Sequence, residues 1–298
     1  MKIPLATRDG VAPSCVSLPA GSWPTMLDFV LQRFAAIDES EWRRRMAALE
    51  LVDEFGVPVT PERRYQPHIR LYYYRSLAHE PRISFDEVLL FQDEHLVVAH
   101  KPHFLPVTAG GQYVQEVLQV RLKRRLKIDT LQPIHRIDRE TAGVVVFCVQ
   151  AHERDAYHAL FRQHAVQKTY QAIAPWSAEL NFPQRRHSRI VQGEPFFLQR
   201  EAQGAPNALT EVDVLEVQGA RARYRLLPHT GQKHQLRVHM AALGLALEND
   251  PFYPEVRRAQ GESDDWNRPL QLLAKSIAFV DPVTGQQRHF ESPQELRL

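Results

Sequence analysis

The densest run of polar side chains in the chain extends from His135 to Thr141, as His-Arg-Ile-Asp-Arg-Glu-Thr. It comes just before 144–147, a continuous run of valines and phenylalanine that is typical of a buried strand. Polar residues directly before a buried strand lie at the end of a sheet, where a loop can hold them over a cleft. Arg136 and Arg139 favour the ionised form of Asp138 between them. The segment therefore predicts a carboxylate at a cleft, and the alternative is an ordinary loop with a surface ion pair.

A second polar segment begins at Thr230 and has the pattern of an amphipathic helix. Thr230 is the expected N-cap, Leu236 and Met240 fall on one helical face, and Gly244 is placed to end the helix. We expect this helix to present its other side to the same cleft.

Three basic residues lie near the start of that helix. His234 and Arg237 are three residues apart and share one face, so both can address one cleft. Together with Lys233 they would form an anion site at the helix N-terminus. The alternative is a solvated basic face.

Two other chemistries fit the residue types less well. His234 and His239 are five residues apart, which does not place two metal ligands on one helical face, so we predict no metal site. A glycosidase normally needs two carboxylates around the bond that it cleaves. Near Asp138 the chain offers only Glu140, and a single carboxylate suits a reaction that breaks and remakes a glycosidic bond within one substrate.

The composition is that of an ordinary globular protein. The 298 residues include 37 Lys and Arg against 35 Asp and Glu, a formal net charge of +2, so bulk charge alone does not identify a nucleic-acid binder. The basic residues cluster, however, and Lys123, Arg124 and Arg125 are expected on the outer face of a helix within 114–126. No apolar stretch is long enough to span a membrane, and a cytoplasmic location is expected.

The elements that must position these residues form an α+β pattern. Strands are expected at 88–92, 96–101, 144–148, 169–174, 210–217, 222–227, 277–280 and 289–290, with the last pair joined by a hairpin turn at 281–285. Because the order shows no regular alternation of strand and helix, the sheet should be largely antiparallel. We predict a small helical module at 1–80 and a main domain at 81–298.

Five ordered segments resemble the RluA-like pseudouridine synthases. The segment 135–143 resembles the family motif HRLDRxTSG, and 230–239 resembles TGRxHQIRxH. Lys168-Thr169-Tyr170 matches K-x-Y, Lys101-Pro102 matches K-P after an early strand, and 270–285 resembles the C-terminal segment of the family. The chain is therefore identified as a member, over about residues 91–293.

The resemblance implies a fold and a reaction. The fold is a catalytic domain with a largely antiparallel mixed sheet flanked by helices, and the N-terminal module is similar to an S4-type RNA-binding module. Asp138 would attack or deprotonate the ribose, Tyr170 would stack on the uracil and take the proton from C5, and Arg237 would pair with Asp138. Arg136 would hold the flipped nucleotide or fill the space it leaves.

The partner implied is structured RNA, either ribosomal or transfer RNA, with no obligate protein partner and no cofactor. The RNA-binding residues expected are Arg136, His135, Arg139, Thr141, Lys233, His234, Lys123, Arg124 and Arg125. Two alternatives stay open: a non-catalytic RNA-binding protein on the same scaffold, and a glycosylase that would release free base.

Overall fold

Two short helices and a small sheet form the N-terminal region of the structure, a computed structural model that describes residues 4–75, 77, 79–258 and 262–298. In chain order the elements are β1 (Ser14–Ser17), α1 (Met26–Arg33), α2 (Glu39–Ala47), β2 (Leu51–Asp53) and β3 (Arg70–Tyr73). The strands pair antiparallel in the order β1-β3-β2. The expected helices are present, but the module also holds a sheet, whose strands are too short to show a clear alternation in the sequence.

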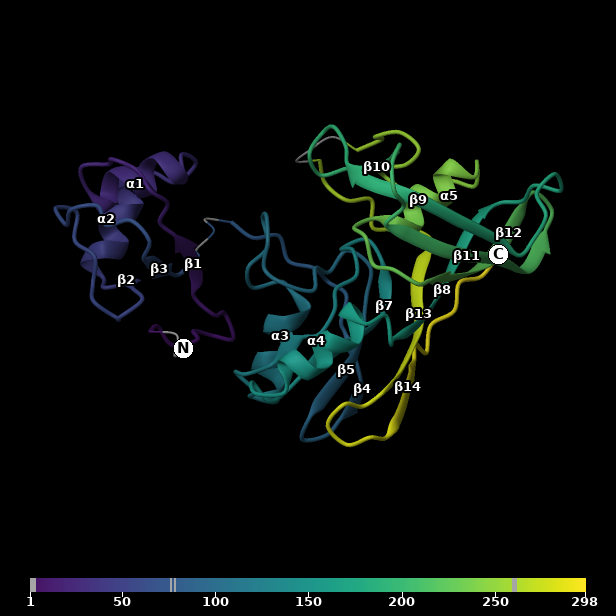
Figure 1. Cartoon of the computed structure of the whole chain (residues 1–298), viewed down its shortest axis with the longest axis horizontal. Coiled ribbons are helices and arrows are strands. Elements are labelled where there is room, and N and C mark those ends of the chain that lie inside the picture. The colour runs from purple at the N-terminus through teal and green to yellow at the C-terminus, as the bar shows by residue number, and fades with distance from the viewer. Residues whose placement is uncertain (1–3, 76, 78, 259–261) are drawn as a thin grey trace.

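This region has its own apolar core. Trp42 of α2 is buried there and packs with Phe34 and Tyr73, with ring centroids 5.4 Å from each. Figure 1 shows the region to one side of the large sheet. The domain boundary at residue 80 and the S4-type identity stay predictions.

The rest of the chain builds a single large sheet with three helices. The elements are β4 (Val88–Gln92), β5 (Leu96–Lys101), α3 (Leu118–Leu126), β6 (Gln132–Pro133), β7 (Ala142–Cys148), α4 (Arg154–Arg162), β8 (Gln167–Pro175), β9 (Gln184–Gln192), β10 (Gln199–Ala202), β11 (Ala208–Gln218), β12 (Arg221–Pro228), α5 (Gln235–Ala242), β13 (Leu272–Val280) and β14 (Gln287–Glu291). The strand order is β10-β9-β11-β12-β8-β13-β7-β5-β4, with β14 beside β13 and β6 beside β7.

The predicted α+β fold with a largely antiparallel mixed sheet is confirmed. Among the paired strands of the described residues, only β7 and β13 run parallel. The expected hairpins β4–β5 and β13–β14 and the expected pair β11–β12 are all present. Strands β9 and β10 were not predicted, because β9 alternates exposed polar residues with half-buried ones and carries little apolar signal.

Helices cover the middle of the sheet on both faces. Val97 and Ala99 of β5 pack in the same cluster as α3, whereas Leu96 and Val98 pack in the same cluster as α4, as the alternation of a strand requires. Helix α5 packs against β8 and β12 through Leu236 and Met240. Figure 1 shows α3 and α4 beside β5 and β7, and α5 at the other end of the sheet.

Gly143 fixes the point at which the polar segment enters the sheet. Its φ is +125°, and a Cβ added there would lie 2.2 Å from the carbonyl oxygen of Ala274 on β13. Only glycine combines this backbone conformation with so close an approach of the neighbouring strand. The parallel pairing of β7 with β13 therefore begins directly after the loop that carries Asp138.

Candidate active site

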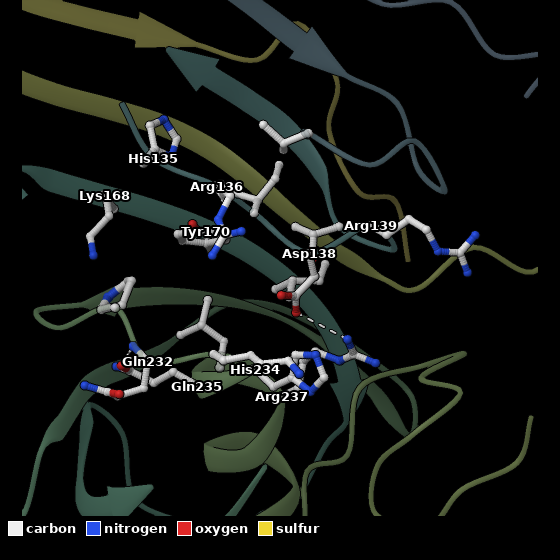
Figure 2. A pocket seen from close by; sticks show the side chains of 18 of the residues that line it. His135, Arg136, Asp138, Arg139, Lys168, Tyr170, Gln232, His234, Gln235 and Arg237 are labelled. Atoms are coloured by element: carbon white, nitrogen blue, oxygen red, sulfur yellow. Dashed lines mark hydrogen bonds and ion pairs between the residues drawn. The ribbon is translucent and has the colours of Figure 1, made fainter. Parts of the chain in front are cut away.

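A cleft of about 560 Å³ opens where the loop between β6 and β7 meets β8 and the start of α5. The sequence placed polar residues of both segments at one cleft, and the structure brings them together there (Figure 2). The predicted residues that line it are Asp138, Tyr170, Arg237, Arg136, His135, Arg139, Thr141, Lys233 and His234.

Hydrogen bonds from the end of β5 hold the backbone of the Asp138 loop. Lys101 is completely buried, and its Nζ donates to the carbonyl oxygen of Arg139 at 3.0 Å. His103 Nδ1 donates to the carbonyl oxygen of Glu140 at 2.7 Å. Burial lowers the pKa of Lys101 to about 7. Both contacts fix the residues that follow Asp138, which explains why the Lys-Pro segment matters to a carboxylate far along the chain.

Asp138 reaches a fully buried guanidinium. Arg237 Nη1 donates to Asp138 Oδ2 at 3.2 Å, and the Asp138 side chain is 25% exposed while that of Arg237 is 0% exposed. The expected pairing of these two residues is present, and Figure 2 shows the Asp138 carboxylate directed at Arg237 from across the cleft. Arg139 points away from Asp138, so Arg237 is the cation that contacts this carboxylate.

Asp250 is the stronger partner of Arg237. Its two carboxylate oxygens accept from Arg237 Nε at 2.8 Å and from Nη2 at 2.7 Å, and both side chains are 0% exposed. This bidentate pair fixes the plane of the guanidinium and leaves Nη1 for Asp138. Sequence reasoning did not identify Asp250, because nothing in its local sequence relates it to a residue of α5.

The second carboxylate near the site, Glu140, is enclosed by arginines. Its oxygens lie 3.1 Å from Arg139, 3.1 Å from Arg258 and 3.6 Å from Arg237. Burial alone would raise the pKa of Glu140, but the charges of Arg237, Arg139 and Arg258 outweigh it and lower the pKa to about 2. A carboxylate held this firmly as an anion does not act as a general acid, so the two-carboxylate arrangement of a glycosidase is absent from the described residues around Asp138.

Arg139 is committed to that network rather than to the cleft. Its guanidinium makes a bidentate contact with Asp264, at 2.6 and 2.7 Å, and Arg258 pairs with the same carboxylate. This occupies the donors that an RNA phosphate would need. Arg139 therefore acts as a brace between the Asp138 loop and the segment before β13.

Tyr170 projects into the cleft from β8. Burial, and next the charge of Asp138, raise the pKa of its phenol, so the hydroxyl stays protonated at neutral pH. The side chain also packs at the edge of the apolar cluster around Leu226 and Leu272. Its ring therefore has a supported face, and the cleft offers a protonated hydroxyl near an anion.

The start of α5 differs from the prediction. The helix begins at Gln235, and its N-cap is His234, in the left-handed region at φ +55°, rather than Thr230. The Thr230 hydroxyl and the backbone N–H of Gln232 both donate to the Gln235 side-chain oxygen, at 2.7 and 3.0 Å. These bonds fold 230–234 into a loop before the helix, so Lys233 precedes the helix instead of lying on it.

The expected end of the helix is confirmed at Gly244. Its φ is +76°, its N–H donates to the carbonyl of Ala241, and the next N–H, of Leu245, donates to Met240. This is the Schellman arrangement.

The remaining cleft residues differ in how free they are. Arg136 is exposed and makes no hydrogen bond or ion pair with any residue that the structure describes. His135 Nε2 accepts from the backbone N–H of Val146 at 3.1 Å, and burial lowers its pKa to about 3, so it is neutral and serves the sheet. His234 is buried, and its Nδ1 lies 2.8 Å from the hydroxyl of Tyr253. Thr141 is only 2% exposed.

The basic cluster of α3 lies outside the cleft lining, and one of its members was predicted wrongly. Lys123 is 3% exposed and faces inward, because α3 packs against both the sheet and the N-terminal residues around Gly10. Arg124 Nε donates to the carbonyl of Asp9 at 2.7 Å. Arg125 is 52% exposed and remains available to solvent.

Two searches of the described residues returned nothing. Across 4–75, 77, 79–258 and 262–298, three or more His, Cys, Asp or Glu side chains nowhere gather in a way that could hold a metal ion. Within the same ranges no helix has the length and apolar character needed to cross a membrane.

Comparison with known proteins adds a family to this geometry. The model of the family described as RNA pseudouridylate synthase matches residues 95–242, which include both polar segments. A mitochondrial pseudouridylate synthase of Rattus norvegicus is 32% identical over 272 residues, covering 79% of this chain and 68% of that protein. The dual-specificity RNA pseudouridine synthase RluA of Haemophilus influenzae is 29% identical over 211 residues, or 70% of this chain and 93% of that protein.

Solved structures agree in fold. Human RNA pseudouridylate synthase domain containing 4 superposes with a TM-score of 0.55 at 26% identity, over 70% of this chain and 88% of that chain. Human RNA pseudouridylate synthase domain containing 1 gives a TM-score of 0.58 at 22% identity, over 72% of this chain and 86% of that one. The resemblance read from the sequence is confirmed, and the chain belongs to the RluA-like family of RNA pseudouridylate synthases and is an intramolecular isomerase.

Proposed function

We propose that this protein isomerises selected uridines of structured RNA to pseudouridine, with Asp138 as the catalytic carboxylate. The observation that carries the proposal is the placement of Asp138 in the cleft, partly open to substrate and held at 3.2 Å by a fully buried arginine. Tyr170 lines the same cleft. A single anion beside an aromatic ring suits a reaction that cleaves and remakes one glycosidic bond in a bound nucleotide.

The reaction conserves all atoms of the substrate. The N1–C1′ bond of uridine breaks as Asp138 attacks or deprotonates the ribose, the uracil rotates, and C5 bonds to C1′. The proton on C5 is lost and N1 gains one. Arg237, fixed by Asp250, keeps Asp138 charged and oriented throughout.

Tyr170 is proposed to stack on the uracil and to take part in the loss of the C5 proton. Because its pKa is raised, the phenol is neutral and accepts this proton only by passing its own proton on. Asp138, whose charge contributes to the raised pKa, is the group to receive it.

The base must first leave its stack, as in other enzymes that act on a base within folded nucleic acid. Arg136, exposed at the cleft and without a partner among the described residues, is proposed to hold the extruded nucleotide or to fill the space it leaves. Lys233 is exposed beside it and suits a phosphate contact.

The RNA class comes from the relatives. A similar protein of Escherichia coli is a ribosomal large subunit pseudouridine synthase, and one of Vibrio cholerae is a tRNA pseudouridine synthase. We therefore propose ribosomal or transfer RNA as the substrate of this chain.

Product analysis tests the proposal. The purified protein is incubated with RNA from a strain lacking its gene, labelled in uracil, and the nucleosides are separated by chromatography. The proposal predicts pseudouridine and no released uracil. Free uracil would indicate a glycosylase, and unchanged uridine in RNA that the protein binds would indicate a non-catalytic binder. Mapping the pseudouridines absent from that strain identifies the target.

A further inference from the structure

A second hollow adjoins the cleft. It measures about 440 Å³ and lies between the end of α4 and the loop after β12. The two hollows have in common Phe161, Lys168, Thr230, Gly231 and Gln232, so they form one continuous depression. The second is lined further by Arg162, His164, Val166, Asn207 and His229.

The charged and ionisable residues of this second hollow are all basic. None of its described lining residues is an aspartate or glutamate. Arg162 pairs with Asp155 at 2.9 Å, but the two side chains are 58% and 88% exposed, and such a surface pair contributes little and exchanges readily. His164 uses Nδ1 to donate to the carbonyl of His229 and so presents its other nitrogen outward.

Lys168 lies where the two hollows meet. Its Nζ donates to the carbonyl oxygen of Thr230 at 2.8 Å and makes no ion pair within the part of the chain that the structure describes. Burial lowers the pKa of Lys168 to about 8. Figure 2 shows its Nζ pointing from β8 into the opening beside the loop that carries Gln232. A half-buried ammonium without a carboxylate is a position at which an anion gains much by binding.

The spacing along β8 relates this ammonium to the reacting base. Lys168 and Tyr170 are two residues apart on one strand, so their side chains project from the same face about 7 Å apart. A nucleotide whose base lies against Tyr170 therefore has its sugar and flanking phosphates within reach of Lys168.

We infer that the second hollow is a subsite for the RNA backbone next to the reactive uridine, in which Lys168 binds one flanking phosphate and Arg162 continues the track. This inference rests on the proposed function and goes beyond it by naming where the adjoining strand runs. The ligand is a phosphodiester anion, and recognition is by charge rather than by base sequence.

The first test is the salt dependence of binding to a synthetic stem–loop RNA with one unpaired uridine. Lys168→Gln and Arg162→Gln should each reduce the slope of log affinity against log salt by about 0.7–0.9, as expected for one lost phosphate contact. Arg225→Gln is the matched control, because Arg225 is also an exposed arginine paired with one aspartate, Asp213, and lines neither hollow. A slope equal to that of the control in either variant would overturn the assignment.

The second test locates the phosphate. In the same RNA, each phosphodiester beside the uridine is replaced in turn by an uncharged methylphosphonate. At one position the replacement should weaken binding of the wild-type protein roughly tenfold, as for loss of a charged hydrogen bond, and should have no further effect in Lys168→Gln. Lys168→Arg, which keeps the charge, should retain the sensitivity. Additive losses at every position would contradict the subsite.

Catalysis separates this inference from the proposed function. With RNA at saturation, Lys168→Gln should convert uridine at nearly the wild-type single-turnover rate, since only binding is lost. A variant with unchanged affinity but a large fall in that rate would assign Lys168 to the chemistry and overturn the subsite. Failure of the protein to form pseudouridine at all would instead refute the proposed function, and the binding tests would still judge the subsite.

Discussion

Charges at the cleft are organised as a line of three residues, Asp138, Arg237 and Asp250. Asp250 takes two donors of the guanidinium and Asp138 takes one, so the buried cation is neutralised from behind and presents its last donor to the cleft. Removing one partner of a buried pair is costly because it leaves an uncompensated charge. Arg237 is therefore fixed by the fold before substrate arrives, which is what orienting a catalytic carboxylate requires.

Tyr170→Phe separates stacking from proton transfer. The ring remains to support uracil, so the affinity for RNA should stay close to that of the wild type. The isomerisation rate should fall by about 10²–10⁴, the usual effect of losing one acid–base group, and a C5-linked adduct that still holds its proton should accumulate. Single-turnover kinetics with mass analysis of the RNA measure both. Wild-type turnover by this variant would leave only the stacking role.

Asp138 could be predicted from the sequence, whereas Asp250 could not. The first lies in a run of polar residues before an apolar strand, a local pattern that any sheet end produces. The second becomes part of the site only because the chain after α5 turns back over Arg237, where Phe252 and Tyr253 also contact the guanidinium. Such contacts depend on tertiary packing and leave no periodic signal.

Among the elements, the start of β7 couples the fold to the site. Gly143 lets β13 approach closely in parallel register directly after the Asp138 loop, and Lys101 on β5 pairs across from it. The loop is therefore held between two strands. Displacement of either strand would move the carboxylate.

Gly143→Ala tests that coupling. The added Cβ meets the backbone of Ala274 at 2.2 Å in a conformation that L-residues rarely adopt, so we expect a loss of about 2–6 kcal/mol of unfolding free energy. Gly219→Ala is the control: its φ is also positive, at +59°, but nothing lies within 4 Å of the new Cβ, and the loss should be about 1–2 kcal/mol. Urea denaturation compares them, and equal losses would show that the close approach is unimportant.

Helix patterns gave mixed results for physical reasons. For α3 the sequence placed its apolar side correctly, but Lys123 turned out to be buried, because the N-terminal residues around Gly10 cover a face that the pattern marks as polar. For α5 the apolar face and the ending at Gly244 were correct. Its start was not, because the Gln235 side chain accepts the hydrogen bonds that an N-cap would otherwise receive.

Over the whole molecule, several buried or half-buried histidines are kept neutral. Burial, as the largest cause, lowers the pKa of His100, His103 and His239 to about 4 and that of His135 to about 3. An unfolded chain binds these protons near pH ~6.5. Since the folded-state pKa values are lower, stability that is fully present above pH ~6.5 is lost as the pH falls towards 4, at up to ~1.4 kcal/mol per pH unit for each histidine.

His100→Asn should weaken this pH dependence. His100 is buried and its Nδ1 lies 3.0 Å from the Ser292 hydroxyl, a hydrogen bond that an asparagine can replace without a titrating group. The difference in unfolding free energy between about pH 7 and about pH 5, from urea denaturation, should be smaller than in the wild type. His152→Asn, at a side chain 79% exposed, should leave that difference unchanged. An equal effect of both variants would contradict the role of burial.

The architecture as a whole was more accessible to sequence reasoning than its details. Strands β5 and β7 are buried on both faces and therefore appear as continuous apolar runs, and the turn residues at 281–285 mark the β13–β14 hairpin. Strand β9 lies towards the edge of the sheet and is rich in arginine, so it has no such signal. The order of the strands arises from long-range pairing, and local patterns do not encode it.

The most direct test of the central claim is pseudouridine formation by Asp138→Asn. An amide neither attacks ribose nor accepts its proton, so the variant should form no detectable product, a loss beyond the ~10²–10⁴ of a single acid–base group. It should still fold, because Asp250 keeps its bidentate contact with Arg237 and the amide oxygen can accept from Nη1. It should also bind RNA, since phosphate contacts dominate affinity. A folded Asp138→Asn protein that converts uridine in RNA at the wild-type rate would contradict the account.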